Sequence, residues 1–357
     1  MMAFLFFVPL AAHLACAKFP DLETRMKPIV LSSSGGFAVG GSVIANPNNA
    51  TQTLSCDHGY MEYFLPWTRR KASLVMWHSS GTQAFQNRFD GGEGYKDMFL
   101  RKDYPVYLWE GPRIGRANWP CVSTTYTPAY LDPTNFWAWN FGPTFKQWWP
   151  DTQFPKDDDE AWNQATRARI PEYDTEENVV LHAQSAAIAA DSGKVGSDIV
   201  YVTNSAAGFR AMLATTLSNS TNIRAIVAYE CIGSVFPEGT TGIPATDGTP
   251  IGYYGPRFVS EHDFQKLARL AAVQFVWGDH RGADGTGNPL TQYLAVTRYL
   301  AETINRYGGN AEVLLLGDDA GLKGSSHLPF ADMDNAKIGA LLEELLRKNG
   351  LDGYAHG

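Results

Sequence analysis

A single serine stands between a run of strand-forming residues and a run of helix-forming residues, in the segment Val200-Tyr-Val-Thr-Asn-Ser205-Ala-Ala-Gly208. A serine at such a sharp turn can attack a carbonyl carbon once a base removes its proton, and the helix start supplies N–H groups for the oxyanion. The turn requires small residues two positions on either side, and here these are Thr203 and Ala207. The sequence therefore predicts a nucleophilic Ser205 in a loosened motif; the alternative is a serine that only caps the helix.

His327 is the histidine best placed to act as the base. Of the eight histidines in the chain, it is the one that follows the last expected strand, 311–316, in a Gly- and Ser-rich loop before the final helix. A loop in this position can reach across the end of a sheet. We therefore expect His327 to remove the proton of Ser205 as a general base.

Two carboxylates are candidates for the acid that orients this histidine. Glu230 ends the expected strand 223–229, and Asp279 follows the expected strand 271–277. Either could stabilise an imidazolium. Asp279 also suits a simple turn, because it lies in Gly-Asp-His, and Glu230 could be a solvated residue at the end of a strand. The residues alone leave this choice open.

The elements that must position these residues alternate along the chain. Expected strands cover 72–78, 104–109, 198–203, 223–229, 271–277 and 311–316, after a β-rich stretch over 35–67. Expected helices lie around 98–100, at 176–191, from 206 onward, at 290–307 and at 336–348. This order predicts an α/β fold with a mainly parallel central sheet flanked by helices. In such sheets the chemistry gathers beyond the carboxyl ends of the strands.

Residues 120–175 differ in composition, because they are rich in aromatic residues, proline and acidic residues without sustained periodicity. We expect this segment to be a lid inserted into a single domain. Trp137, Trp139, Trp148 and Trp149 would then line an apolar substrate pocket. The alternative is that these aromatic residues form ordinary core.

Residues 1–17 are free of charged side chains and end in Ala15-Cys16-Ala17. This pattern predicts a cleaved signal peptide, a mature domain at 18–357, and a secreted protein without a membrane anchor. An uncleaved anchor is the alternative, but about 15 apolar residues are short against the roughly 20 needed to span a bilayer. Sequons at Asn49 and Asn219 fit glycosylation on the same route.

Cleavage would leave Cys56, Cys121 and Cys231. An odd number permits one internal disulfide, and we expect Cys56–Cys121, because Cys231 follows Glu230 in the expected site. No metal-binding spacing such as C-x-x-C or H-E-x-x-H occurs, so neither a metal nor an organic cofactor is expected. The net charge of −8 and the lack of a long basic run argue against nucleic acid as a partner.

Several motifs together carry a resemblance to a known family. They are Cys56-Asp-His-Gly-Tyr-Met-Glu-Tyr-Phe-Leu-Pro66, Gly94-Tyr-Lys-Asp-Met-Phe-Leu100, Tyr104-Pro-Val-Tyr107, the Ser205 turn, Tyr229-Glu230, Gly278-Asp279 and Lys323-Gly-Ser-Ser-His327. Over residues 28–350 the chain resembles the secreted bacterial and fungal esterases of the α/β-hydrolase fold whose triad acid is a glutamate after the sixth strand.

The resemblance implies Glu230 rather than Asp279 as the acid. It also implies an oxyanion hole formed by the backbone N–H groups of Ser80 and Ala206, although the loop reads His78-Ser-Ser-Gly81 where the family commonly has His-Gly-Gly. The expected function is cleavage of a small-molecule carboxylic ester or lactone through an acyl-enzyme. Two other functions stay open: a tailoring enzyme that performs a non-hydrolytic reaction on a natural product, and an inactive ligand-binding protein of the same fold.

Overall fold

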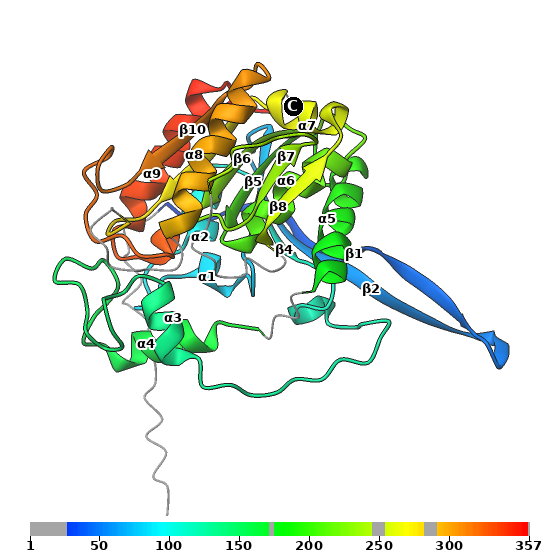
Figure 1. Cartoon of the computed structure of the whole chain (residues 1–357). Helices are drawn as coiled ribbons and strands as arrows, with labels where there is room; N and C mark the ends of the chain where they lie inside the picture. Colours follow the sequence, from blue (N-terminus) through cyan, green and yellow to red (C-terminus); the bar gives the residue numbers. More distant parts are fainter. Residues whose placement is uncertain (1–26, 171–174, 245–253, 282–290, 356–357) are drawn as a thin grey trace, which may run out of the picture.

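An eight-stranded sheet lies at the centre of the protein, with strand order β1-β2-β4-β3-β5-β6-β9-β10 (Figure 1). The computed structural model describes residues 27–170, 175–244, 254–281 and 291–355. The strands are β1 (Leu31–Asn46), β2 (Asn49–Pro66), β3 (Ala72–Trp77), β4 (Val106–Glu110), β5 (Asp198–Asn204), β6 (Ile223–Tyr229), β9 (Ala272–Trp277) and β10 (Ala311–Leu315). The expected fold class is confirmed.

Six neighbouring strands of the sheet, β4, β3, β5, β6, β9 and β10, run parallel. The pairs β1–β2 and β2–β4 are antiparallel. Every residue of β3, β4, β5 and β9 is buried, as is all of β6 except one. Strands buried on both faces read as nearly continuous apolar runs, which is why these segments were recognisable in the sequence.

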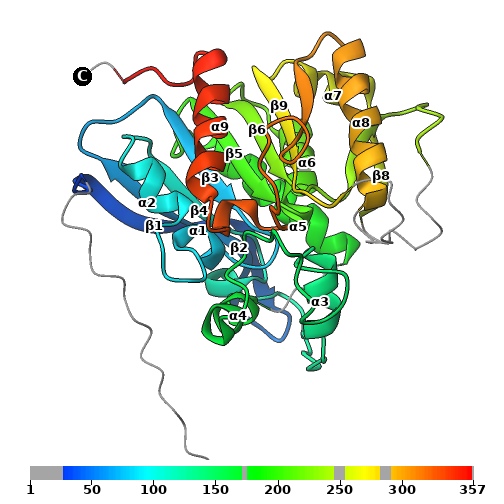
Figure 2. The ribbon, with the colours of Figure 1, turned by 90° about the vertical axis from the view of Figure 1, so that its left-hand side faces the viewer.

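Helices cover both faces of the sheet (Figure 2). One core cluster contains residues of α5 (Glu176–Asp191), α6 (Ala206–Leu217), α7 (Glu261–Ala268) and α8 (Thr291–Arg306). The other contains residues of α1 (Gln83–Gln86), α2 (Tyr95–Leu100) and α9 (Asn335–Lys348). In α9 the buried residues Ile338, Leu342 and Leu345 recur at helical spacing, so that one face of the helix packs on the sheet.

The aromatic-rich segment after β4 holds two short helices, α3 (Asp132–Ala138) and α4 (Asp159–Arg167), which the sequence pattern did not reveal. Its aromatic rings pack on one another. The ring centroids of the stacked pair Trp148 and Phe154 are 5.2 Å apart, and those of Phe136 and Trp162 are 5.5 Å apart. These rings join the core cluster of the α9 face. The segment is therefore held to the domain by its own side chains.

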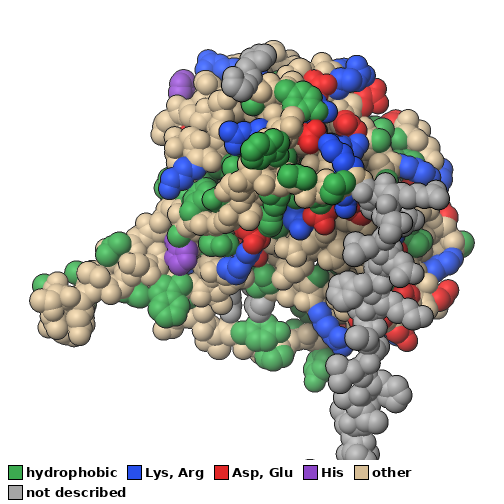
Figure 3. Space-filling model, turned by 180° about the vertical axis from the view of Figure 1, so that it is seen from behind, with side chains coloured by type: hydrophobic (Ala, Val, Ile, Leu, Met, Phe, Trp, Pro, Cys, Tyr) green, Lys and Arg blue, Asp and Glu red, His purple; other side chains and the backbone are tan. Residues whose placement is uncertain are grey.

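β1 and β2 form a long hairpin that projects from the body (Figures 1 and 3). A disulfide between Cys56 and Cys121 joins β2 to the segment after β4, and Cys231 is a buried free thiol. The predicted disulfide pairing is thus confirmed.

A small two-stranded sheet, β7 (Ser234–Pro237) with β8 (Pro256–Val259), lies outside the main sheet, and the sequence analysis did not predict it or α7. Short 3₁₀ turns occupy Gly115–Ala117 and Pro329–Ala331. The predicted signal peptide, residues 1–17, lies outside the described residues. Within the described part of the chain, no helix combines the length and the apolar character needed to cross a bilayer.

Candidate active site

Ser205 occupies the sharp turn between β5 and α6. Its backbone has φ 57° and ψ −131°, a strained combination for a residue with a side chain. Between Asp198 and Met212 it is the one residue that is not buried. The strand and the helix therefore hold this serine in an unfavourable backbone conformation and leave it accessible from outside.

The residues around Ser205 explain how the turn forms without the usual glycines. Thr203 is fully buried, and its hydroxyl donates to the carbonyl of Val227 on β6 at 3.2 Å. Gly208 lets α6 approach β6, because a Cβ there would lie 2.7 Å from Cys231 Sγ and 3.0 Å from Ala228 Cβ. The close contact needed in this motif is thus made one position later than in the usual form.

His327 and Glu230 meet in the interior. His327 Nδ1 lies 3.3 Å from Glu230 Oε2, and both residues are buried, with 3% and 0% of their surface exposed. Asn204, next to the serine, donates from its side chain to the His327 carbonyl at 2.9 Å. The loop that carries His327 is therefore tied to the turn that carries Ser205.

The remaining nitrogen of His327, Nε2, is the one available to a serine hydroxyl. Within the described residues, Nδ1 is engaged with Glu230, and the ring is not hydrogen-bonded to Ser205 Oγ. Catalytic hydrogen bonds are often long in unliganded sites and shorten when a substrate binds.

Arg281 also contacts Glu230, and the sequence analysis did not single it out. Its Nη2 lies 2.6 Å from Glu230 Oε2, and its side chain is 2% exposed. The Gly278 N–H donates to Glu230 Oε1 at 2.5 Å. Burial alone would raise the pKa of the Glu230 carboxyl, but Arg281, His327 and this N–H hold the pKa below its usual value. Glu230 is therefore a carboxylate.

The pKa of His327 is lowered by burial and by the positive charge of Arg281, although Glu230 acts in the opposite direction. A histidine with a lowered pKa is neutral at pH 7 and can accept a proton. The electrostatics of the pair therefore suit a base.

Asp279, the alternative acid, lies elsewhere. Its Oδ2 accepts the Gly324 N–H at 2.9 Å, and its carbonyl accepts the Asn140 side chain at 2.6 Å. Asp279 groups with Asp151 and His280, whose ligand atoms lie within 4.8 Å of one another, which makes this group the metal-binding candidate among the described residues. His280 Nε2 and Asp151 Oδ1 already satisfy each other at 2.8 Å. The structure brings Glu230, and not Asp279, to His327.

The loop after β3 faces the same end of the sheet. His78 Nδ1 accepts the N–H of Ser80 at 3.1 Å and that of Gly81 at 3.3 Å. Burial is the main cause that lowers the pKa of His78 to about 3, so its ring is neutral. The hydrogen bonds then require the tautomer with a proton on Nε2. Ser80, an expected oxyanion donor, therefore directs its N–H at this ring.

Ala206, the other expected donor, is the first residue of α6. An N–H in that position has no partner within its helix and points out of the helix end. Further along α6, the buried Arg210 donates to the Ser79 carbonyl at 3.3 Å, which fixes the position of the β3 loop relative to the Ser205 helix.

The buried carboxyl group of Asp332 holds the loop that carries His327. Asp332 accepts the Ser326 N–H at 2.7 Å and the Ser326 hydroxyl at 2.8 Å, and it is 1% exposed. Burial raises the pKa of Asp332 to about 8. Asp332 and Arg281 escaped the sequence analysis because nothing in their local pattern shows that they face Ser326 and Glu230.

The four expected pocket tryptophans have different surroundings. The backbone carbonyl of Trp139 accepts the His327 N–H at 2.9 Å. The guanidinium of Arg169 lies over the Trp139 ring, 5.2 Å from its centroid. Trp149 stacks on His280 at 4.4 Å. Trp148 packs inside the aromatic cluster of its own segment, whereas Trp137 is half-buried on α3. Trp139 thus contacts the loop that carries His327 through its backbone carbonyl.

Comparisons with known proteins identify the fold. No family model matches the sequence, and a comparison with curated proteins found no match. Among solved structures, a novel bacterial esterase superposes with a TM-score of 0.70 at 21% identity, covering 92% of this chain and 99% of that one. An esterase of Pyrobaculum calidifontis covers 90% of this chain and 87% of its own at 10% identity, with a TM-score of 0.42. The chain has the α/β-hydrolase fold.

Proposed function

We propose that the protein is a serine hydrolase that cleaves a small-molecule carboxylic ester or lactone, with Ser205 as nucleophile, His327 as base and Glu230 as acid. The observation that carries the proposal is the combination of a strained, accessible serine with a buried, neutral histidine paired to a carboxylate at the same end of the sheet. The esterase of similar fold supports the same reaction class.

The reaction follows from the orientation of His327. Because Nδ1 faces Glu230, Nε2 takes the proton of Ser205 as Oγ attacks the carbonyl carbon of the substrate. The resulting imidazolium then gives this proton to the leaving alcohol oxygen, and an acyl-enzyme remains. Water attacks the acyl carbon with His327 again as base, which releases the carboxylic acid and restores the serine.

The oxyanion of each tetrahedral intermediate needs N–H donors. We assign the Ala206 N–H to this role because it lies at the start of α6, directly after the nucleophile. Ser80 is the second donor in the proposal. Its N–H must leave His78 Nδ1 to reach a substrate oxygen, so the hole is completed only when a substrate is bound.

The substrate site lies under the aromatic-rich segment in this proposal, with Trp139 at the loop that carries His327 and an apolar acyl or alcohol group against the rings. We also propose a secreted, glycosylated protein. Exposed Asn49 and Asn219, and a disulfide at Cys56–Cys121, support this location.

Hydrolysis of p-nitrophenyl acetate tests the proposal. The unaltered protein is expected to turn over the ester, and Ser205→Ala to lose at least about 10³-fold in kcat, because no other group replaces the nucleophile. Ser234→Ala, at a buried serine on β7, is the matched control and keeps full activity. A Ser205→Ala variant as active as this control would refute the proposal.

A further inference from the structure

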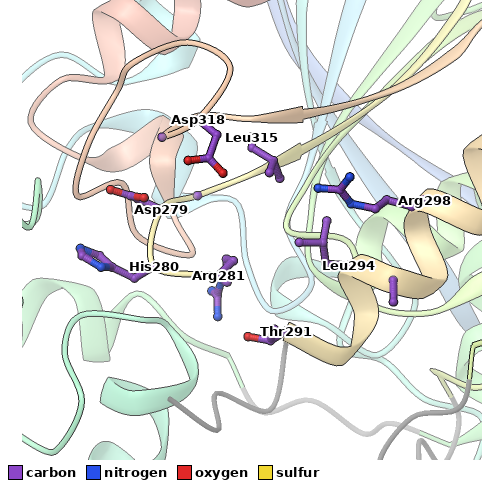
Figure 4. Close-up of a pocket in the computed structure, with 11 residues that line it drawn as sticks. Asp279, His280, Arg281, Thr291, Leu294, Arg298, Leu315 and Asp318 are labelled. Carbon is purple, nitrogen blue, oxygen red and sulfur yellow. The ribbon is translucent and has the colours of Figure 1, made fainter. Parts of the chain in front are cut away.

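A pocket lies near Glu230, at the ends of β9 and β10 and against α8 (Figure 4). It has a volume of about 530 Å³, which is within the range of small-molecule sites, and neither Ser205 nor His327 lines it. It is therefore separate from the proposed reaction centre, although Arg281 belongs to its wall.

The inner end of this pocket holds two polar groups without partners. Arg281 Nη1 and Thr291 Oγ1 are both buried, and within the described residues neither has a hydrogen-bond partner. Arg281 lies with its guanidinium directed toward Thr291, the first residue of α8 (Figure 4). Buried donors left unsatisfied are costly, so two of them at one pocket call for a ligand.

The charges at this end favour an anion. Arg281 is paired with Glu230 through Nε and Nη2, and its Nη1 remains as a charge-assisted donor. Arg298, an exposed arginine farther along α8, provides a second cation at the rim.

Glu230 offsets the charge of Arg281, and the two carboxylates that line the pocket have contacts of their own, so Arg298 remains as the cation without a carboxylate partner among the described residues. Asp318 is 74% exposed and lies 4.0 Å from Lys323. Asp279 accepts a backbone N–H and is directed away from Arg281 in Figure 4. The remaining wall is apolar, with Leu294 and Leu315 facing the hollow (Figure 4).

From this arrangement we infer that the pocket binds a short organic carboxylate, whose charged end meets Arg281 and the Thr291 hydroxyl and whose apolar end lies on Leu294 and Leu315. Arginine donates strong, charge-assisted hydrogen bonds to carboxylates, and Nη1 of Arg281 is free to donate one here. Because Arg281 also holds Glu230, the ligand and the acid share one guanidinium.

Butyrate titration of the full chain in a calorimeter tests the inference, with butyramide as the uncharged match and sulfate as an anion without an apolar part. The Ser205→Ala variant is used, so that the result does not depend on the proposed hydrolysis. We expect one saturable butyrate site, no binding of butyramide and weaker binding of sulfate. Sulfate that binds as tightly as butyrate would overturn the apolar part of the assignment, and no saturable butyrate binding would overturn all of it.

Variants locate the site. Thr291→Val and Arg298→Gln remove one donor and one charge without touching Glu230, and together they should weaken butyrate binding about tenfold or more. Arg306→Gln, at the far end of the same helix, is the matched control and should bind as the parent does. Unchanged affinity in the double variant, with an unchanged melting temperature, would place butyrate elsewhere and refute the inference.

Discussion

Glu230 and Asp279 are the two carboxylates that could orient His327, because each follows one of two neighbouring strands, β6 and β9. Only Glu230 contacts His327, at 3.3 Å. Glu230→Gln keeps the shape but removes the charge that stabilises the imidazolium. We expect kcat to fall about 10²- to 10⁴-fold, by comparison with loss of the acid in other triads.

Asp279→Asn is the matched control for that change. Its carbonyl contact to Asn140 is made by the backbone and survives the substitution. We expect activity within about threefold of the parent, since the amide oxygen of asparagine can still accept the Gly324 N–H. Both variants are measured by steady-state hydrolysis of p-nitrophenyl acetate. A larger loss of kcat in Asp279→Asn than in Glu230→Gln would identify Asp279 as the acid.

Arg281 gives a prediction on pH dependence. His327 must be neutral to act as the base, so activity is present above its pKa and is lost as the pH falls through it. Burial and the Arg281 charge both lower that pKa. The acidic limb of kcat/KM is therefore expected below pH 6.5, the ordinary value for histidine.

Removal of the Arg281 charge should raise the pKa of His327, so Arg281→Gln is expected to move the acidic limb to higher pH. Arg281→Lys keeps a charge and should leave the limb close to that of the parent. A merely structural role of Arg281 would lower the rate of both variants without a shift of the limb, and that result would contradict the electrostatic account.

The contact between α6 and β6 determines the geometry of the turn at the scale of elements. Gly208 is the position at which α6 comes closest, since an added Cβ would meet Cys231 Sγ at 2.7 Å. Alanine is favoured over glycine inside a helix by about 1 kcal/mol, but overpacking a tight core costs about 1–3 kcal/mol. We expect the second effect to dominate, because Ala228 Cβ also lies only 3.0 Å away.

Gly208→Ala should therefore lower the melting temperature and also reduce kcat, because α6 carries Ser205 and Ala206. Adding Cys231→Ala removes the sulfur and should restore part of both. Thermal unfolding followed by circular dichroism provides the measurement. A stabilised single variant would show that α6 can shift without cost, which the packing around Gly208 argues against.

The same elements show what the sequence could and could not predict. The buried strands and the Ala-rich helix α5 were recognisable because their apolar patterns are long. β7 and β8 escaped because four-residue strands leave almost no pattern. Two strand-end carboxylates look alike in sequence, and only the folded geometry shows which one His327 reaches.

Contacts between distant parts of the chain were the least predictable. The Arg281–Glu230 pair joins residues 51 positions apart that meet only after the sheet has formed. The Asp332–Ser326 contact spans only six positions, but no local pattern indicates it. The direction of the Ser80 N–H was likewise hidden, because it depends on the ring of His78 rather than on the residue type at position 80.

At the scale of the whole molecule, the sheet gathers three residues with left-handed backbone at the ends of three adjacent strands. Ser205 follows β5, Glu230 follows β6 and His280 follows β9, with φ values of 57°, 50° and 55°. Strained backbone persists where the surrounding structure enforces it, and it gathers at functional sites. These three positions lie at the strand ends where the proposed chemistry takes place, whereas other non-glycine residues with positive φ, such as Asp57 and Asp103, lie elsewhere in the chain.

The most direct measurement of the central claim is the reaction of the full chain with a fluorophosphonate, followed by intact-mass measurement and peptide mapping. An activated serine forms a covalent phosphonyl adduct, whereas an ordinary serine hydroxyl does not react. The account predicts one adduct, located on Ser205, and slower labelling in Glu230→Gln. Labelling of another residue, or none in a folded protein, would contradict it.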